Sequence, residues 1–154
     1  MKRLSTLQTQ LRSNLYKGVI NMQTTYKNFK ITSTFLHNKC WSCNGSNYNN
    51  HMITVTNTET HKKTAFEFWG SMINPEITTT QELLFAFYCF LSDGESSQYG
   101  FNDFCENFGY DTDSRKAYKV FELCQRALQK AERIGINENI ACDMINDLQE
   151  NYEC

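Results

Sequence analysis

The chain has 154 residues, of which 40% are apolar, and this is enough for one ordinary hydrophobic core. Aromatic residues make up 14%, which excludes a disordered chain, and no run of 18 apolar residues could cross a membrane. The N-terminus has no apolar stretch of the kind a secretory signal needs, so we expect a cytoplasmic protein whose seven cysteines are reduced.

The formal net charge of -2 hides a strongly uneven charge distribution. Residues 1–63 carry a net charge of +8, whereas residues 64–114 hold nine acids and no lysine or arginine. Residues 115–133 return to +4, and residues 134–154 hold five acids and no base. Such blocks can form an acidic and a basic face on one small protein, or they can interleave once the chain folds.

The first part of the chain is expected to be an extension. Leucines at helical spacing with basic residues between them predict a short amphipathic helix over residues 2–16, and Gly18 would end it. We therefore expect an N-terminal extension over residues 1–21, followed by a single α+β domain over residues 22–154.

Three segments alternate apolar and polar residues, as strands with one buried face do. The expected inward-facing side chains are Phe29, Ile31, Ser33 and Phe35 in the first segment, Ile53 and Val55 in the second, and Phe66 and Phe68 in the third. A turn is expected over residues 57–60. Three consecutive strands predict an antiparallel β-meander, whose apolar face needs helices over it.

The remainder of the chain is predicted to supply those helices. Thr79 and Glu82 have the spacing of a capping box, and Asp93-Gly94 is expected to end the helix that follows. A final helix is expected over residues 137–152. The predicted fold class is thus α+β, a three-stranded antiparallel β-meander packed against C-terminal α-helices.

The segment from Phe101 to Ala117 is the most informative in the chain. Apolar residues Phe101, Phe104, Cys105 and Phe108 share one helical face, and Gly109 stands where a helix ends in a left-handed residue. Asp111 or Asp113 is expected to cap the next, long helix, which Gly135 would end.

The sequence contains no pattern typical of an enzyme. It has no Gly-x-Ser-x-Gly motif and no glycine-rich phosphate loop, so we expect neither catalysis nor a cofactor. Cys40 and Cys43 have the spacing of one half of a zinc site, which would have to recruit His51 and His61 through the fold. The alternatives are a redox pair or a loop that merely contains two thiols.

Two kinds of interaction surface are compatible with the charges. The acids Asp103, Glu106, Asp111 and Asp113 could present a phosphate-like array to a basic groove on another protein. Alternatively, exposed lysines and aromatics of the sheet region could bind nucleic acid, although the isoelectric point near 5.9 speaks against it. The residues of this alternative are Lys27, Lys30, Lys39, Trp41, Lys62 and Lys63.

Four segments together carry a family resemblance: residues 66–74, the helix of residues 83–91, residues 101–105 and residues 109–117. They resemble a group of small proteins carried by bacteriophages and other mobile elements, which share the signature F-x-x-F-C-x-x-F-G-Y-D-x-D-S-R-K-A. The resemblance covers roughly residues 26–135. It brings no catalytic residues to this chain.

The resemblance implies a setting by analogy. Accessory phage proteins of this size often act by binding a host protein, and defence inhibitors such as anti-CRISPR proteins are among them. The resulting hypothesis is a non-enzymatic protein in the bacterial host cytoplasm that inhibits a nucleic-acid-handling complex such as a CRISPR effector. The acids at positions 103, 106, 111 and 113, or the C-terminal helix, would bind the partner, and a small nucleic-acid-binding module is the alternative.

Overall fold

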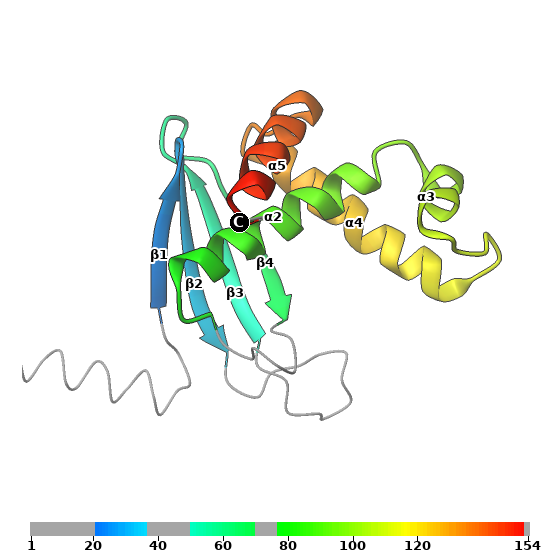
Figure 1. Cartoon of the computed structure of the whole chain (residues 1–154), viewed down its shortest axis with the longest axis horizontal. Coiled ribbons are helices and arrows are strands. Elements are labelled where there is room, and N and C mark those ends of the chain that lie inside the picture. Colours follow the sequence, from blue (N-terminus) through cyan, green and yellow to red (C-terminus); the bar gives the residue numbers. More distant parts are fainter. Residues whose placement is uncertain (1–20, 37–49, 70–76, 153–154) are drawn as a thin grey trace, which may run out of the picture. The chain divides into compact units, whose positions relative to one another are not determined.

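The computed structural model describes residues 21–36, 50–69 and 77–152 of the chain (Figure 1). The strands are β1 (Asn21–Tyr26), β2 (Phe29–Leu36), β3 (Asn50–Asn57) and β4 (Lys63–Trp69). The helices are α2 (Thr80–Ser96), α3 (Phe101–Phe108), α4 (Arg115–Arg133) and α5 (Glu138–Tyr152). The predicted α+β class is confirmed.

The described residues fall into two compact units. The first contains most of the sheet and the beginning of α2, and the second contains the β3–β4 turn, the rest of α2 and the three later helices. Each unit is described by itself below.

The sheet has four antiparallel strands in the order β1-β2-β3-β4 (Figure 1), so the prediction of three strands is wrong. The additional strand, β1, pairs with β2 from Asn21 opposite Thr34 to Tyr26 opposite Phe29. Lys27, with φ of 52°, begins the two-residue turn between them. Because this turn contains no glycine, it lacks the usual sequence signal of a hairpin.

The predicted burial pattern of the strands is largely confirmed. Phe29, Ile31 and Ser33 of β2 are buried, as are the predicted inward residues of β3. In β4, Phe66 is buried but Phe68 is only partly so. Burial alternates along β2 and β3 as expected for strands with one covered face.

Helix α2 begins as predicted but ends later. The Thr79 hydroxyl accepts a hydrogen bond from the Glu82 N–H at 3.1 Å, and the Glu82 carboxylate accepts from the Thr78 N–H at 2.7 Å. The predicted end at Asp93-Gly94 is wrong, because α2 continues to Ser96. A Cβ at Gly94 would lie 3.1 Å from the Leu128 Cα, so this glycine permits close approach of the α4 backbone.

Helices α3 and α4 share a small core. Phe104 and Cys105 of α3 are buried together with Ala117 and Cys124 of α4, and partly buried hydrophobic residues pack around them. Gly109 has φ of 71°, which confirms the left-handed end of α3. The helices of the Phe101 to Ala117 segment are therefore held together by its apolar residues, as the pattern predicts.

The cap of α4 differs from the prediction. The Ser114 hydroxyl accepts from the Ala117 N–H at 3.2 Å, so Ser114 is the N-cap. Asp111 instead accepts from the Asp113 N–H at 3.3 Å and stabilises the preceding turn. The prediction of an aspartate cap is wrong because α4 begins at Arg115, which places both aspartates before the capping position.

The end of α4 is joined to the β3–β4 turn within the second unit. Gly135, with φ of 88°, ends α4 as predicted. The Asn57 side-chain amide donates to the Ile134 carbonyl at 2.9 Å, and its oxygen accepts from the Glu59 and Thr60 N–H groups. One buried asparagine thus orders the turn and satisfies a carbonyl at the helix end.

Candidate functional site

The four acids singled out from the sequence lie in or next to α3. Asp103 and Glu106 are on the helix, while Asp111 and Asp113 are in the turn that leads to α4, and all four are exposed. Asp103 and Glu106 are three residues apart and therefore neighbours on the helix surface. Within the described chain, none of the four forms an ion pair.

Two exposed aromatic side chains accompany these acids. Phe108 is 56% exposed and Tyr110 is 37% exposed. Phe108 lies on the apolar face of α3, as predicted, because its ring packs on that of Phe104, but it stands at the solvent-exposed edge of the small core. We call Asp103, Glu106, Phe108, Tyr110, Asp111 and Asp113 the α3 surface.

The buried ring of Phe104 contacts both exposed rings. Its ring centroid lies 4.9 Å from that of Phe108 and 5.9 Å from that of Tyr110, with Tyr110 stacked on it. The Tyr110 N–H also donates to the Cys105 carbonyl at 2.9 Å. This is the hydrogen bond of a Schellman motif, and the contact between residues 110 and 104 is its usual hydrophobic partner. The α3 surface therefore offers two exposed aromatic rings that both pack on a buried one.

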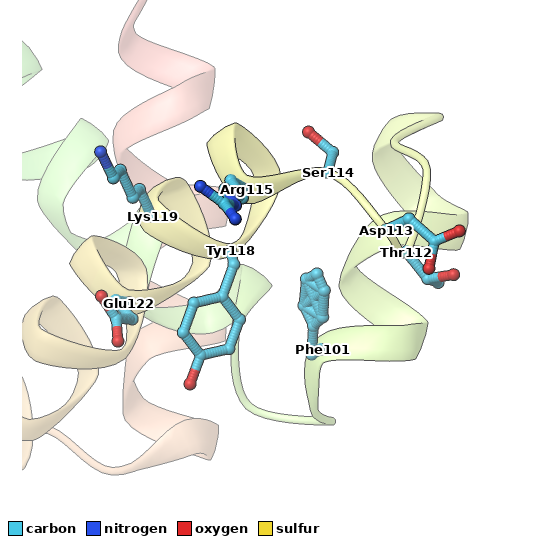
Figure 2. Close-up of a pocket in the computed structure, with 8 residues that line it drawn as sticks. All are labelled: Phe101, Thr112, Asp113, Ser114, Arg115, Tyr118, Lys119 and Glu122. Carbon is cyan, nitrogen blue, oxygen red and sulfur yellow. The ribbon is translucent and has the colours of Figure 1, made fainter.

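A cavity of about 380 Å³ opens between the start of α3, the turn and the first two turns of α4 (Figure 2). Phe101 and Tyr118 approach each other there with ring centroids 5.4 Å apart in an edge-to-face arrangement. Arg115 and Lys119 line the same cavity from α4, and Asp113 lines it from the turn. No sequence motif marks Tyr118 as part of a site; its position directly after buried Ala117 places it at the edge of the α3–α4 core.

The lysines of the alternative surface are divided between the two units. Lys27 and Lys30 belong to the first unit and Lys62 and Lys63 to the second, and all four are exposed. The Lys27 ammonium lies 5.5 Å from the centroid of the Tyr26 ring, a cation–π contact. Lys39 and Trp41 lie outside the described residues.

The zinc hypothesis rests on residues that the structure describes only in part. Cys40 and Cys43 lie outside the described residues, and in the described ranges no three His, Cys, Asp or Glu side chains cluster as metal ligands would. His61 is exposed in the β3–β4 turn with φ of 63°, where its N–H donates to the Asn57 carbonyl.

His51 is almost fully buried and has both ring nitrogens engaged. Its Nε2 accepts from the Ile77 N–H at 3.0 Å, and its Nδ1 lies 3.2 Å from the Ser33 hydroxyl. Because Nε2 accepts, the neutral ring carries its proton on Nδ1 and donates it to Ser33. This geometry gives His51 a structural role and leaves it no lone pair for a metal.

Three described thiols of the second unit are poorly activated. Burial, with a contribution from Asp93, raises the pKa of Cys89 to about 11. Burial also raises the pKa of Cys105 and of Cys124. Since the thiolate is the reactive form, these cysteines are weak nucleophiles at neutral pH.

A scan against protein families and searches of curated proteins and of solved structures find no match to this chain. The resemblance to small phage proteins therefore stays a prediction. In the part of the chain that the structure describes, no helix combines the length and the apolar character needed to cross a membrane.

Proposed function

We propose that this chain is a non-enzymatic binding protein that docks on a basic protein surface through the α3 surface. The observation that carries this proposal is the presence of two exposed aromatic rings, Phe108 and Tyr110, among four exposed carboxylates that form no ion pair with any described residue. Interfaces between proteins are commonly built from aromatic anchors surrounded by a polar rim.

The two kinds of residue have different parts in such an interface. Phe108 exposes more than half of its surface, and burying it against a partner would remove apolar area from water. The carboxylates would attract a basic partner, speed the encounter and disfavour acidic competitors. Packing on Phe104 restricts both rings before binding, which lowers the conformational entropy that binding would cost.

A basic partner surface is typical of proteins that handle nucleic acid. The resemblance to phage proteins points the same way, and the partner we propose is a host complex of this kind, such as a CRISPR effector, which the chain would inhibit. The engaged ring nitrogens of His51 and the raised pKa values of the buried thiols support binding rather than catalysis.

The test is capture of host proteins on the immobilised chain, with charge reversal of Asp103→Lys and Glu106→Lys. These residues are preferable to Asp111 and Asp113, because Asp111 orders the turn by accepting from the Asp113 N–H. We expect wild-type protein to capture a basic nucleic-acid-handling protein, which excess nucleic acid releases. The double variant should lose most of this capture.

The matched control changes the net charge equally at exposed acids away from α3, with Glu59→Lys and Asp143→Lys. Circular dichroism and thermal unfolding establish that both double variants are folded. If the control loses capture as fully as the α3 variant, net charge and not this surface governs binding. If the α3 variant retains full capture, the partner binds elsewhere and the proposal is wrong.

A further inference from the structure

Helix α4 carries a second charged surface that the proposed function does not use. Its residues at positions 115, 119, 122, 126, 130 and 133 follow each other at intervals of three or four, so they form one stripe along the helix. Five of them are basic, and Glu122 is the only acid. We call Arg115, Lys119, Arg126, Lys130 and Arg133 the α4 stripe. It is about 27 Å long at a rise of 1.5 Å per residue.

The charges of the α4 stripe are not neutralised within the described residues. None of the five cations forms an ion pair there. Lys130 has its pKa lowered, first by burial and then by the charges of Arg126 and Arg133. Three cations that repel one another at the end of one helix favour an anionic ligand, since its charge would relieve the repulsion.

The cavity lies at the opposite end of the α4 stripe. Tyr118 is 51% exposed at the cavity, and Arg115 and Lys119 of the stripe line the same space (Figure 2). The cavity is shallow and largely open to solvent, so it can accept a flat ring laid against Tyr118 but does not enclose a ligand. An exposed aromatic ring close to basic side chains is an arrangement on which bases of single-stranded nucleic acid stack.

The cavity also contains two carboxylates, Asp113 and Glu122. These carboxylates would repel a phosphate inside the cavity. We therefore expect the phosphates of a bound strand to lie outside the cavity, on the cations of the α4 stripe. Carboxylate oxygens accept hydrogen bonds from the exocyclic amino group of cytosine. The composition of the cavity therefore fits a base better than a free anion.

We propose that single-stranded nucleic acid binds along α4, with its phosphates on the α4 stripe and one base in the cavity against Tyr118. This surface is distinct from the α3 surface except for Asp113, and from the lysines of the sheet region. If the partner is a nucleic-acid-handling complex, as proposed above, the chain would contact its protein through the α3 surface and its nucleic acid through α4.

The experiment measures fluorescence anisotropy of a labelled 20-nucleotide DNA strand titrated with the full chain between 50 and 200 mM salt. We expect binding whose affinity falls with salt, with a log–log slope of about -3.5 if all five cations contact phosphates. Replacing Arg126, Lys130 and Arg133 by glutamine should reduce the magnitude of this slope by about 2. Glutamine retains high helix propensity, so α4 is expected to remain folded.

Substitutions at Tyr118 test the cavity independently of charge. Tyr118→Leu should weaken binding about tenfold with an unchanged salt slope, because it removes a stacking surface. Tyr118→Phe keeps the ring and should restore wild-type affinity. A strand of cytosines should bind more tightly than one of thymines, which lack the amino group.

The control replaces Lys30, Lys62 and Lys63 by glutamine, which removes the same charge from the sheet region. The proposal is overturned if the strand does not bind, if this control loses affinity as much as the α4 triple variant, or if Tyr118→Leu has no effect. A further outcome overturns the proposal: self-association of the chain at low salt that is abolished by the α4 triple variant and also by the Asp103→Lys, Glu106→Lys variant. The occupant of the stripe would then be the α3 surface of a second copy.

Discussion

Replacing Asn57 by alanine should destabilise the second unit, and by more than the replacement of an exposed asparagine does. Asn57 is 6% exposed, and its side chain makes three hydrogen bonds to backbone groups, those of Glu59, Thr60 and Ile134. Ile134 is fully buried, so its carbonyl would lose its donor without gaining water.

The magnitude follows from these three bonds. A buried carbonyl left unsatisfied costs about 1–3 kcal/mol, and each bond to the turn contributes about 0.5–1.5 kcal/mol. Because the turn N–H groups can reach water, we take the low end for them and expect a loss of about 2–4 kcal/mol in the free energy of unfolding. For a chain of this size that corresponds to a fall in Tm of roughly 5–15 °C.

Urea unfolding followed by circular dichroism measures this loss, with Asn107→Ala as the control. The Asn107 side chain is exposed and makes no hydrogen bond within the described chain, so its replacement should not destabilise the protein by more than about 0.5 kcal/mol. Asn57→Asp keeps the acceptor for the turn but sets a carboxylate oxygen against the Ile134 carbonyl. It should therefore be at least as destabilising as alanine at pH 7. A loss below about 1 kcal/mol for Asn57→Ala would refute the reasoning.

Three other predictions concern the same unit. Gly94→Ala should destabilise by up to about 2 kcal/mol, because crowding against the Leu128 backbone outweighs a gain of about 1 kcal/mol in helix propensity; a stabilised variant would contradict this. Burial raises the pKa of Asp93 from 3.8 to about 6, so between these pH values the folded state binds the proton more tightly than the unfolded state does. The free energy of unfolding should therefore fall as pH rises from about 4 to about 6. Asp93→Asn should therefore be more stable than wild type at pH 7.5 and equal to it near pH 3.5 in urea unfolding, although the accessible surface of Asp93 moderates the effect. Iodoacetamide labelling followed by mass spectrometry should modify Cys89 and Cys124 far more slowly in the folded protein than in urea at pH 8, and equal rates would contradict their raised pKa values.

The features that the sequence predicts correctly are those set by local chemistry. Gly109 and Gly135 end helices because their backbones are left-handed, and Thr79 begins α2 because its hydroxyl accepts a backbone N–H. The alternation of β2 and β3 is visible because most of their inward positions are apolar, as at Phe29, Ile31, Ile53 and Val55.

The features that it misses depend on distant contacts or on small shifts of register. The sequence predicts that Gly94 ends a helix. In the structure α2 continues past it, and the glycine is needed because the backbone of α4 passes close by at Leu128. Ser114 rather than an aspartate caps α4 because the helix begins at Arg115, one residue later than an Asp113 cap and three later than an Asp111 cap would require. Strand β1 is missed because its turn at Lys27 contains no glycine.

The candidate surfaces show the same division. The acids of the α3 surface are evident from composition, but the exposure of Phe108 depends on which residues fill the α3–α4 core. The spacing of the α4 stripe could have been read from the sequence, since Arg126, Lys130 and Arg133 recur at helical intervals. Its proximity to an exposed Tyr118 in a cavity is a property of the fold.

The central claim is that a partner protein docks on the α3 surface. Hydrogen–deuterium exchange of the chain, alone and bound to the protein that it captures, tests this most directly. We expect slower exchange in the complex over residues 101–113, with little change in the β3–β4 turn. Protection confined to the sheet, with no change over residues 101–113, would contradict the account.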